Sequence, residues 1–345
     1  MSEYQTKCET ALCSGDWNHA AREALAWARH PASVELLDPR PHFVLNVVHL
    51  IKGHFAEAWA SHAKCLMEES DIAQVKNWVD ELVARHATNA SAHLIMGLFL
   101  AQSGQSEQSM QSYKEAAKFA PESAYPHYFL AQIHERANHL EMAIKEYKEA
   151  VRLDPTYAPA RTNLGVAYQE QGRLEMAIPQ YREVIKLNPN DAVAHANLGC
   201  ALAEQGKMEP AVQAYKEAIR LNPNDAEVHF ALGGLYETRG RLDLAQKEYR
   251  EALRANPDFG PAHTALGWIS LGKGHLQDAY EALNRGLKAN AEDARAYHGI
   301  AEYYAQKRKP ESAMDNYMKA LKYYQDPDKK NAIMNQLFQE GRVPD

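Results

Sequence analysis

The sequence contains few cysteines, and none is placed to build a disulfide framework or a zinc finger. Its 345 residues include four, Cys8, Cys13, Cys65 and Cys200, with no CxxC pair among them. Small secreted domains held by disulfides have a much higher cysteine density, and zinc fingers use closely spaced cysteine pairs. We therefore expect reduced, structural thiols and no metal site built from cysteine.

An excess of basic residues is also missing. Lys and Arg together number 38 and Asp and Glu 45, which gives a formal net charge of −7. Proteins that bind DNA or RNA carry basic surfaces that neutralise phosphates. This charge balance therefore argues against a nucleic-acid partner.

Long apolar runs and catalytic motifs are absent as well. No stretch approaches the roughly 18 uncharged apolar residues of a membrane span, and the first residues, MSEYQTKCETALCSGDW, lack the basic cluster and apolar core of an export signal. The sequence contains no GxSxG, GxxxxGK[ST], GxGxxG or HExxH motif that could form a site. We expect a cytoplasmic protein that is not inserted in a membrane, is not an enzyme and needs no cofactor.

What the sequence has instead is a repeat. Similar segments follow one another every 34 residues without insertion. They begin at Ala90, Ala124, Ala158, Ala192, Ala226, Gly260 and Ala294. In the repeat that starts at Ala192, the recurring positions are His195, Leu198, Gly199, Leu202, Ala211, Tyr215, Ala218 and Pro223. This pattern resembles the tetratricopeptide repeat family.

The recurring positions also have a direct physical meaning. Leu164 and Tyr168 are four residues apart on one face of a first helix, and Ala177, Tyr181 and Val184 form an apolar stripe on a second. Each first helix is expected to end at a glycine that can adopt positive φ (Gly172, Gly206, Gly240). Each second helix is expected to end before a proline (Pro155, Pro189, Pro223, Pro257), and aspartates are placed to cap the next helix (Asp191, Asp225, Asp293).

The fold class predicted from these features is all-α. Because one helix pair cannot bury enough apolar surface alone, neighbouring repeats must share a continuous core. The resemblance implies an α-solenoid, a right-handed superhelix whose first helices line a concave groove. We expect a divergent, repeat-like helical region over residues 1–89, seven tandem repeats over 90–327, and a C-terminal capping helix and tail over 328–345. On that last helix, one apolar face holds Ile333, Met334, Leu337 and Phe338.

The N-terminal region allows more than one reading. Residues 1–34 resemble a degenerate repeat, with Gly15, Ala20 and Pro31 near the expected positions. A further repeat could cover residues 39–70 and leave the following helix without a partner. Alternatively, residues 56–89 could form the repeat, with Trp59 in the aromatic position. The two registers exclude each other, and the sequence leaves both open.

Sixteen histidines invite a metal hypothesis, which the repeat argues against. Five of them occupy one repeat position: His93, His127, His195, His229 and His263. Equivalent positions in stacked repeats stand one helix pair apart, far beyond a shared coordination sphere with bonds of about 2.0–2.1 Å. We therefore expect structural histidines and no metal.

In proteins of this family, residues of the first helices line the groove. The corresponding residues here are Tyr128, Phe129, Gln132, Glu135, Asn163, Glu170, Asn197, Glu204, Phe230, Glu237 and Trp268. Chaperone-binding members grip a terminal carboxylate with lysine and arginine residues, and the matching positions here lack them. Asn163 and Asn197 instead resemble the asparagine ladder of O-linked N-acetylglucosamine transferase, which holds a peptide backbone.

The resemblance implies an interaction scaffold that binds a partner peptide or helix in the groove. We expect a partner with apolar or aromatic anchors and basic flanks, because aromatic and acidic residues share the predicted wall. One alternative is a self-assembling homo-oligomer that uses the N-terminal region and the open solenoid ends. Another is an accessory subunit of a larger enzyme complex.

Overall fold

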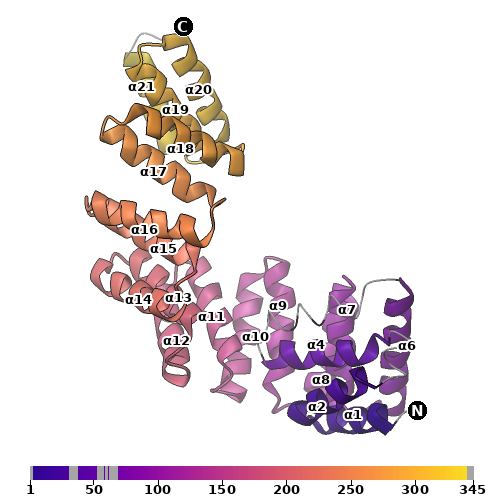
Figure 1. Cartoon of the computed structure of the whole chain (residues 1–345). Coiled ribbons are helices and arrows are strands. Elements are labelled where there is room, and N and C mark those ends of the chain that lie inside the picture. The colour runs from indigo at the N-terminus through magenta and orange to yellow at the C-terminus, as the bar shows by residue number, and fades with distance from the viewer. Residues whose placement is uncertain (1–2, 31–37, 53–57, 59–60, 62–68, 340–345) are drawn as a thin grey trace. The chain divides into compact units, whose positions relative to one another are not determined.

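The computed structural model describes residues 3–30, 38–52, 58, 61 and 69–339. All regular structure in that part of the chain is α-helical, which confirms the predicted fold class (Figure 1). The helices fall into two compact units, unit 1 (Met1–Pro189) and unit 2 (Asn190–Asp345). Within the described residues, no helix has the length and apolar character needed to cross a membrane.

In the described part of unit 1, four N-terminal helices precede three helix pairs. The four are α1 (Glu3–Ser14), α2 (Trp17–Ala28), α4 (Arg40–Lys52) and α6 (Glu69–Arg85). The pairs are α7 (Ala90–Gln102) with α8 (Ser106–Phe119), α9 (Ala124–Arg136) with α10 (Leu140–Leu153), and α11 (Ala158–Glu170) with α12 (Leu174–Leu187).

The described residues of unit 2 form four helix pairs and a final single helix. The pairs are α13 (Ala192–Glu204) with α14 (Met208–Leu221), α15 (Ala226–Thr238) with α16 (Leu242–Ala255), α17 (Gly260–Gly272) with α18 (Leu276–Ala289), and α19 (Ala294–Gln306) with α20 (Pro310–Tyr323). The last helix is α21 (Pro327–Gln339).

The pairs follow the sequence repeat, because each first helix begins where a repeat begins. The turn inside each pair needs a left-handed residue: Gly172, Gly206 and Gly240 have φ values of 70°, 79° and 71°. The side chain of Asp191 accepts a hydrogen bond from the Ala194 N–H (2.9 Å), and Asp225 and Asp293 cap their helices in the same way. The predicted turn and cap residues are confirmed.

A glycine in the first helix allows the second helix to approach closely. A Cβ atom added at Gly165 would lie 2.6 Å from Cε1 of Tyr181, and one at Gly199 would lie 2.8 Å from Cδ1 of Tyr215. The tyrosine ring therefore packs directly against the glycine backbone. This contact explains why glycine and tyrosine recur together in the sequence.

The N-terminal helices pack onto the first repeat and share its core. The ring of Phe43 on α4 lies 6.4 Å from that of Trp78 on α6 and 5.8 Å from that of Phe99 on α7. The Trp78 indole N–H and the Arg85 guanidinium both donate to Glu9 of α1, at 2.6 and 2.8 Å. Helix α6 packs against both α4 and α7.

Two sequence predictions lie partly outside the described residues. Trp59, on which the register 56–89 depends, is one such residue, so the choice between the two N-terminal registers stays open. On α21, Ile333 and Leu337 are buried in one cluster with Tyr317 and Ala320, as a capping helix requires. The Phe338 side chain lies outside the described part.

Candidate functional site

The first helices of unit 2 place a row of polar and aromatic side chains on one surface, here called the first-helix wall of unit 2. Its members are Asn197, Glu204, Phe230, Glu237, Trp268, Arg295 and His298. Side chains from α15, α17 and α19 meet there. Arg295 Nη2 lies 2.9 Å from Glu237 Oε1, and the Trp268 indole N–H donates to the Arg295 carbonyl at 3.0 Å. Three consecutive repeats thus contribute to one continuous surface.

Two aromatic rings on this wall are partly open to solvent and held in place by their neighbours. Phe230 is half-buried, with ring centroids 5.4 Å from Tyr249 and 5.5 Å from Phe259. Trp268 is also half-buried, and its ring is nearly perpendicular to that of His298, with the two centroids 5.0 Å apart. Rings fixed by packing bind a partner's apolar group with little loss of side-chain entropy.

The carboxylate of Glu237 has two partners. The Tyr249 hydroxyl donates to one oxygen, and Arg295 pairs with the other. Burial, followed by the bond to Glu237, raises the pKa of Tyr249 well above its usual value. Glu204 is exposed and accepts a hydrogen bond from the Cys200 thiol at 3.4 Å, and Asn197 is half-buried. The acidic character predicted for this wall is therefore partly balanced by Arg295.

In unit 1, two of the predicted groove residues belong to the core. Tyr128 and Phe129 are only 0% and 3% exposed. Tyr128 lies 5.1 Å from the ring of Tyr157, and Phe129 stacks on Tyr113 at 5.6 Å. The expectation that these two rings are open anchors for a partner is therefore wrong, because other aromatic rings of the chain already cover them.

The remaining predicted residues of unit 1 form local polar contacts. Glu135 and Asn163 both bond the Tyr147 hydroxyl, which donates to Glu135 at 2.8 Å and accepts from Asn163 at 3.2 Å. Burial is the largest influence on Glu135 and raises its pKa. Gln132 donates to the Tyr128 hydroxyl at 3.0 Å, and Glu170 is exposed. Asn163 is thus engaged with its own chain in this structure.

Helix α4 lies against the first helices of unit 1. Asn46 on α4 accepts a hydrogen bond from the Gln102 amide of α7. Beyond α9, the Tyr157 hydroxyl donates to the carbonyl of Ile51 at 2.9 Å. Most residues of the segment RPHFVLNVVHLIK are buried, including the consecutive run from Phe43 to Val48, as expected of a helix covered from several directions. The chain itself therefore occupies part of the surface where sequence analysis placed a groove.

The recurrent histidines act within the repeat. His229 Nδ1 lies 2.8 Å from Glu248 Oε2, and its Nε2 lies 3.2 Å from the Pro223 carbonyl. His263 contacts the Pro257 carbonyl in the same way at 2.9 Å, and His127 pairs with a glutamate at 2.7 Å. These rings tie a first helix to its own second helix and to the turn before it.

Comparison with protein families agrees with this architecture. The model described as the cilia and flagella-associated protein 70 C-terminal domain matches residues 24–298, which is most of the chain. The chain belongs to this family. Residues 294–327 of this family member also match a tetratricopeptide repeat model, which confirms the resemblance inferred from sequence. A comparison with curated proteins finds no match.

Solved structures share the fold of this family member. The crystal structure of the APC/C hetero-tetramer Cut9-Hcn1 has a TM-score of 0.57 and 15% identity, over 93% of this chain and 73% of that one. A structure of pilF from Pseudomonas aeruginosa has a TM-score of 0.53 and 21% identity, over 66% of this chain and 99% of that one. At these identities the likeness establishes the fold alone.

Arg295 is a wall residue that sequence analysis missed. Arg295 precedes the positions at which the family pattern places groove residues, so its position in the repeat gave no signal. Arg295 and Glu237 are 58 positions apart in the sequence, and their contact joins two repeats.

Proposed function

We propose that this family member is a protein-interaction scaffold whose first-helix wall of unit 2 binds a segment of a partner protein. The repeat fold supports the general role, because stacked helix pairs create extended surfaces suited to binding other proteins. The single observation that carries the site is the pair Phe230 and Trp268. Both rings lie on consecutive first helices and are held by packing while part of each surface stays open.

The partner segment should contain apolar or aromatic anchors with basic flanks. Anchors that fill an interface centre each contribute about 2 kcal/mol or more when truncated. Glu204 is exposed, and Glu237 already binds the guanidinium of Arg295. A lysine or arginine of the partner would take the same kind of position as that guanidinium. In this proposal the protein acts by binding rather than by catalysis.

Selection of peptides from a random display library on the immobilised full chain tests this proposal. We expect enrichment of sequences that combine Trp, Phe, Tyr or Leu with Lys or Arg. The same selection on a Phe230→Ala, Trp268→Ala double variant should lose them. A Tyr280→Ala variant is the matched control, because Tyr280 is a half-buried ring on a second helix of the same unit. Enrichment of acidic peptides, or equal enrichment on the double variant, would place the partner elsewhere.

Self-assembly is the competing interpretation, and its test must use the full chain. Deleting residues 1–89 would uncover the face of Phe99 that Phe43 now covers, so association of the truncated chain would be uninformative. Light scattering over a wide dilution range gives the mass of the intact protein. A concentration-dependent mass that Phe230→Ala and Trp268→Ala abolish would show that the wall binds another copy of the chain.

A further inference from the structure

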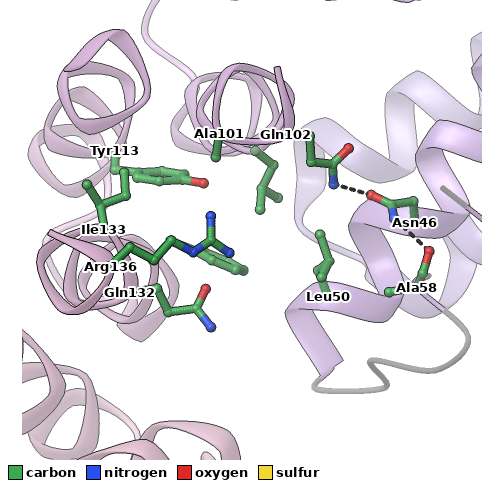
Figure 2. Close-up of a pocket in the computed structure, with 11 residues that line it drawn as sticks. Asn46, Leu50, Ala58, Ala101, Gln102, Tyr113, Gln132, Ile133 and Arg136 are labelled. Atoms are coloured by element: carbon green, nitrogen blue, oxygen red, sulfur yellow. Dashed lines mark hydrogen bonds between the residues drawn. The ribbon is translucent and has the colours of Figure 1, made fainter. Parts of the chain in front are cut away.

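Unit 1 contains a pocket between α4 and the first repeats. It has a volume of about 410 Å³ and lies among side chains from α4, α7, α8 and α9, together with Ala58 (Figure 2). Small-molecule sites commonly have volumes of about 300–1,000 Å³. The pocket is therefore large enough for a small organic ligand.

The interior of the pocket is apolar. Leu50 of α4, Leu98 of α7 and Ile133 of α9 line it, and the rings of Tyr113 and Phe129 stack on each other at 5.6 Å beside them. Its α4 side is fixed by hydrogen bonds from Gln102 to Asn46 and from Asn46 to the Ala58 carbonyl, the latter 2.7 Å long. The pocket thus combines an apolar interior with a hydrogen-bonded polar edge.

One cation, Arg136, lines the pocket without a salt bridge to another described residue, although its charge acts on the neighbouring Glu135 carboxylate. Among the described residues that line the pocket, Arg136 is the only charged one, and its guanidinium points between Tyr113 and Gln132 (Figure 2). It forms no hydrogen bond or ion pair with another described residue. The neighbouring carboxylate of Glu135 instead accepts from the Tyr147 hydroxyl. A guanidinium beside apolar walls favours a ligand that carries a carboxylate on an apolar body.

We propose that this pocket binds a small monocarboxylic acid with an aliphatic chain or ring. The apolar part would lie against Leu50, Leu98 and Ile133, and the carboxylate would pair with Arg136. An extended protein segment fits less well. Because α4 bonds to Gln102 and Tyr157, such a segment could follow the first helices only by displacing α4. The site is separate from the first-helix wall of unit 2.

Titration calorimetry of the full chain with sodium octanoate, octylammonium and 1-octanol tests this site. We expect octanoate to bind at least about tenfold more tightly than octylammonium, because the guanidinium attracts one head group and repels the other. Because Arg136 is exposed, Arg136→Gln should weaken octanoate by up to about fivefold and leave 1-octanol unchanged. Arg182→Gln, an exposed arginine of α12 outside the pocket, is the matched control and should behave like the parent.

A second variant tests the apolar part. Ala101 is half-buried and lines the pocket, so Ala101→Leu should narrow it and weaken binding of octanoate and 1-octanol alike. Circular dichroism would verify that both variants are folded. Equal affinity for octanoate and octylammonium, undiminished binding by Ala101→Leu, or no heat with millimolar octanoate would overturn the proposal.

The outcome is independent of the proposed scaffold function. The Phe230→Ala, Trp268→Ala double variant should bind octanoate like the parent, and Arg136→Gln should bind the selected peptides like the parent. Displacement of a selected peptide by octanoate would instead assign the pocket to the protein partner, and the small-acid proposal would be wrong.

Discussion

Two adjacent glycines in α15 allow a matched test of the packing between first and second helices. A Cβ at Gly233 would lie 2.6 Å from Cε1 of Tyr249, whereas one at Gly234 would meet only the Tyr249 hydroxyl at 4.0 Å. Replacing a helical glycine by alanine stabilises a helix by about 0.8–1.0 kcal/mol. Overpacking a filled core costs about 1–3 kcal/mol.

Gly234→Ala should therefore raise the free energy of unfolding by up to about 1 kcal/mol. In Gly233→Ala the same gain is offset by displacement of the Tyr249 ring, so this variant should be less stable than Gly234→Ala by about 1–3 kcal/mol. Tyr249 also contacts Phe230 and donates to Glu237, so its displacement should disturb the proposed site as well.

Urea denaturation followed by circular dichroism compares the two variants with the parent. Because repeat arrays need not unfold in a single step, hydrogen exchange of the α15 amides should be measured alongside. We expect faster exchange in Gly233→Ala and unchanged or slower exchange in Gly234→Ala. Equal stabilisation by both alanines would refute the helix packing described here.

Three further predictions follow from single contacts. Asp225→Ala should cost about 0.5–2 kcal/mol in urea denaturation, because the carboxylate caps α15 through two backbone N–H groups. Burial lowers the pKa of His134 in the folded protein. The neutral imidazole therefore contributes stability that is fully present above the unfolded-state pKa and is lost as pH falls through the folded-state pKa. In thermal unfolding, His134→Gln should lose less stability on acidification than the parent does. Arg295→Ala should free Glu237 and raise the affinity for a selected basic peptide at most about fivefold in calorimetry, since exposed ion pairs contribute up to about 1 kcal/mol.

The sequence predicts the repeat architecture well because each repeat imposes the same local rules. A glycine that ends a helix, an aspartate that caps one and a tyrosine that packs on a glycine are determined by neighbours within one helix pair. Gly206, Asp191 and Tyr215 accordingly have the expected roles in the structure.

The candidate site is harder to predict because it depends on contacts between distant segments. Tyr128 occupies a groove position of the repeat, yet Tyr157 and Tyr147 cover it. The position of α4 against α7 depends on side chains outside the repeat, such as Phe43 and Asn46. Repeat position alone therefore identifies the wall but not which parts of it stay open.

The affinity of a selected peptide for the full chain tests the proposed function most directly. Calorimetry should show a loss of at least about 2 kcal/mol in binding free energy for the Phe230→Ala, Trp268→Ala double variant. The Tyr280→Ala control should bind like the parent. For the parent, added salt should slow association more than it speeds dissociation, because rim charges act mainly on encounter. Undiminished affinity of the double variant would contradict the assignment of the first-helix wall of unit 2 as the binding site.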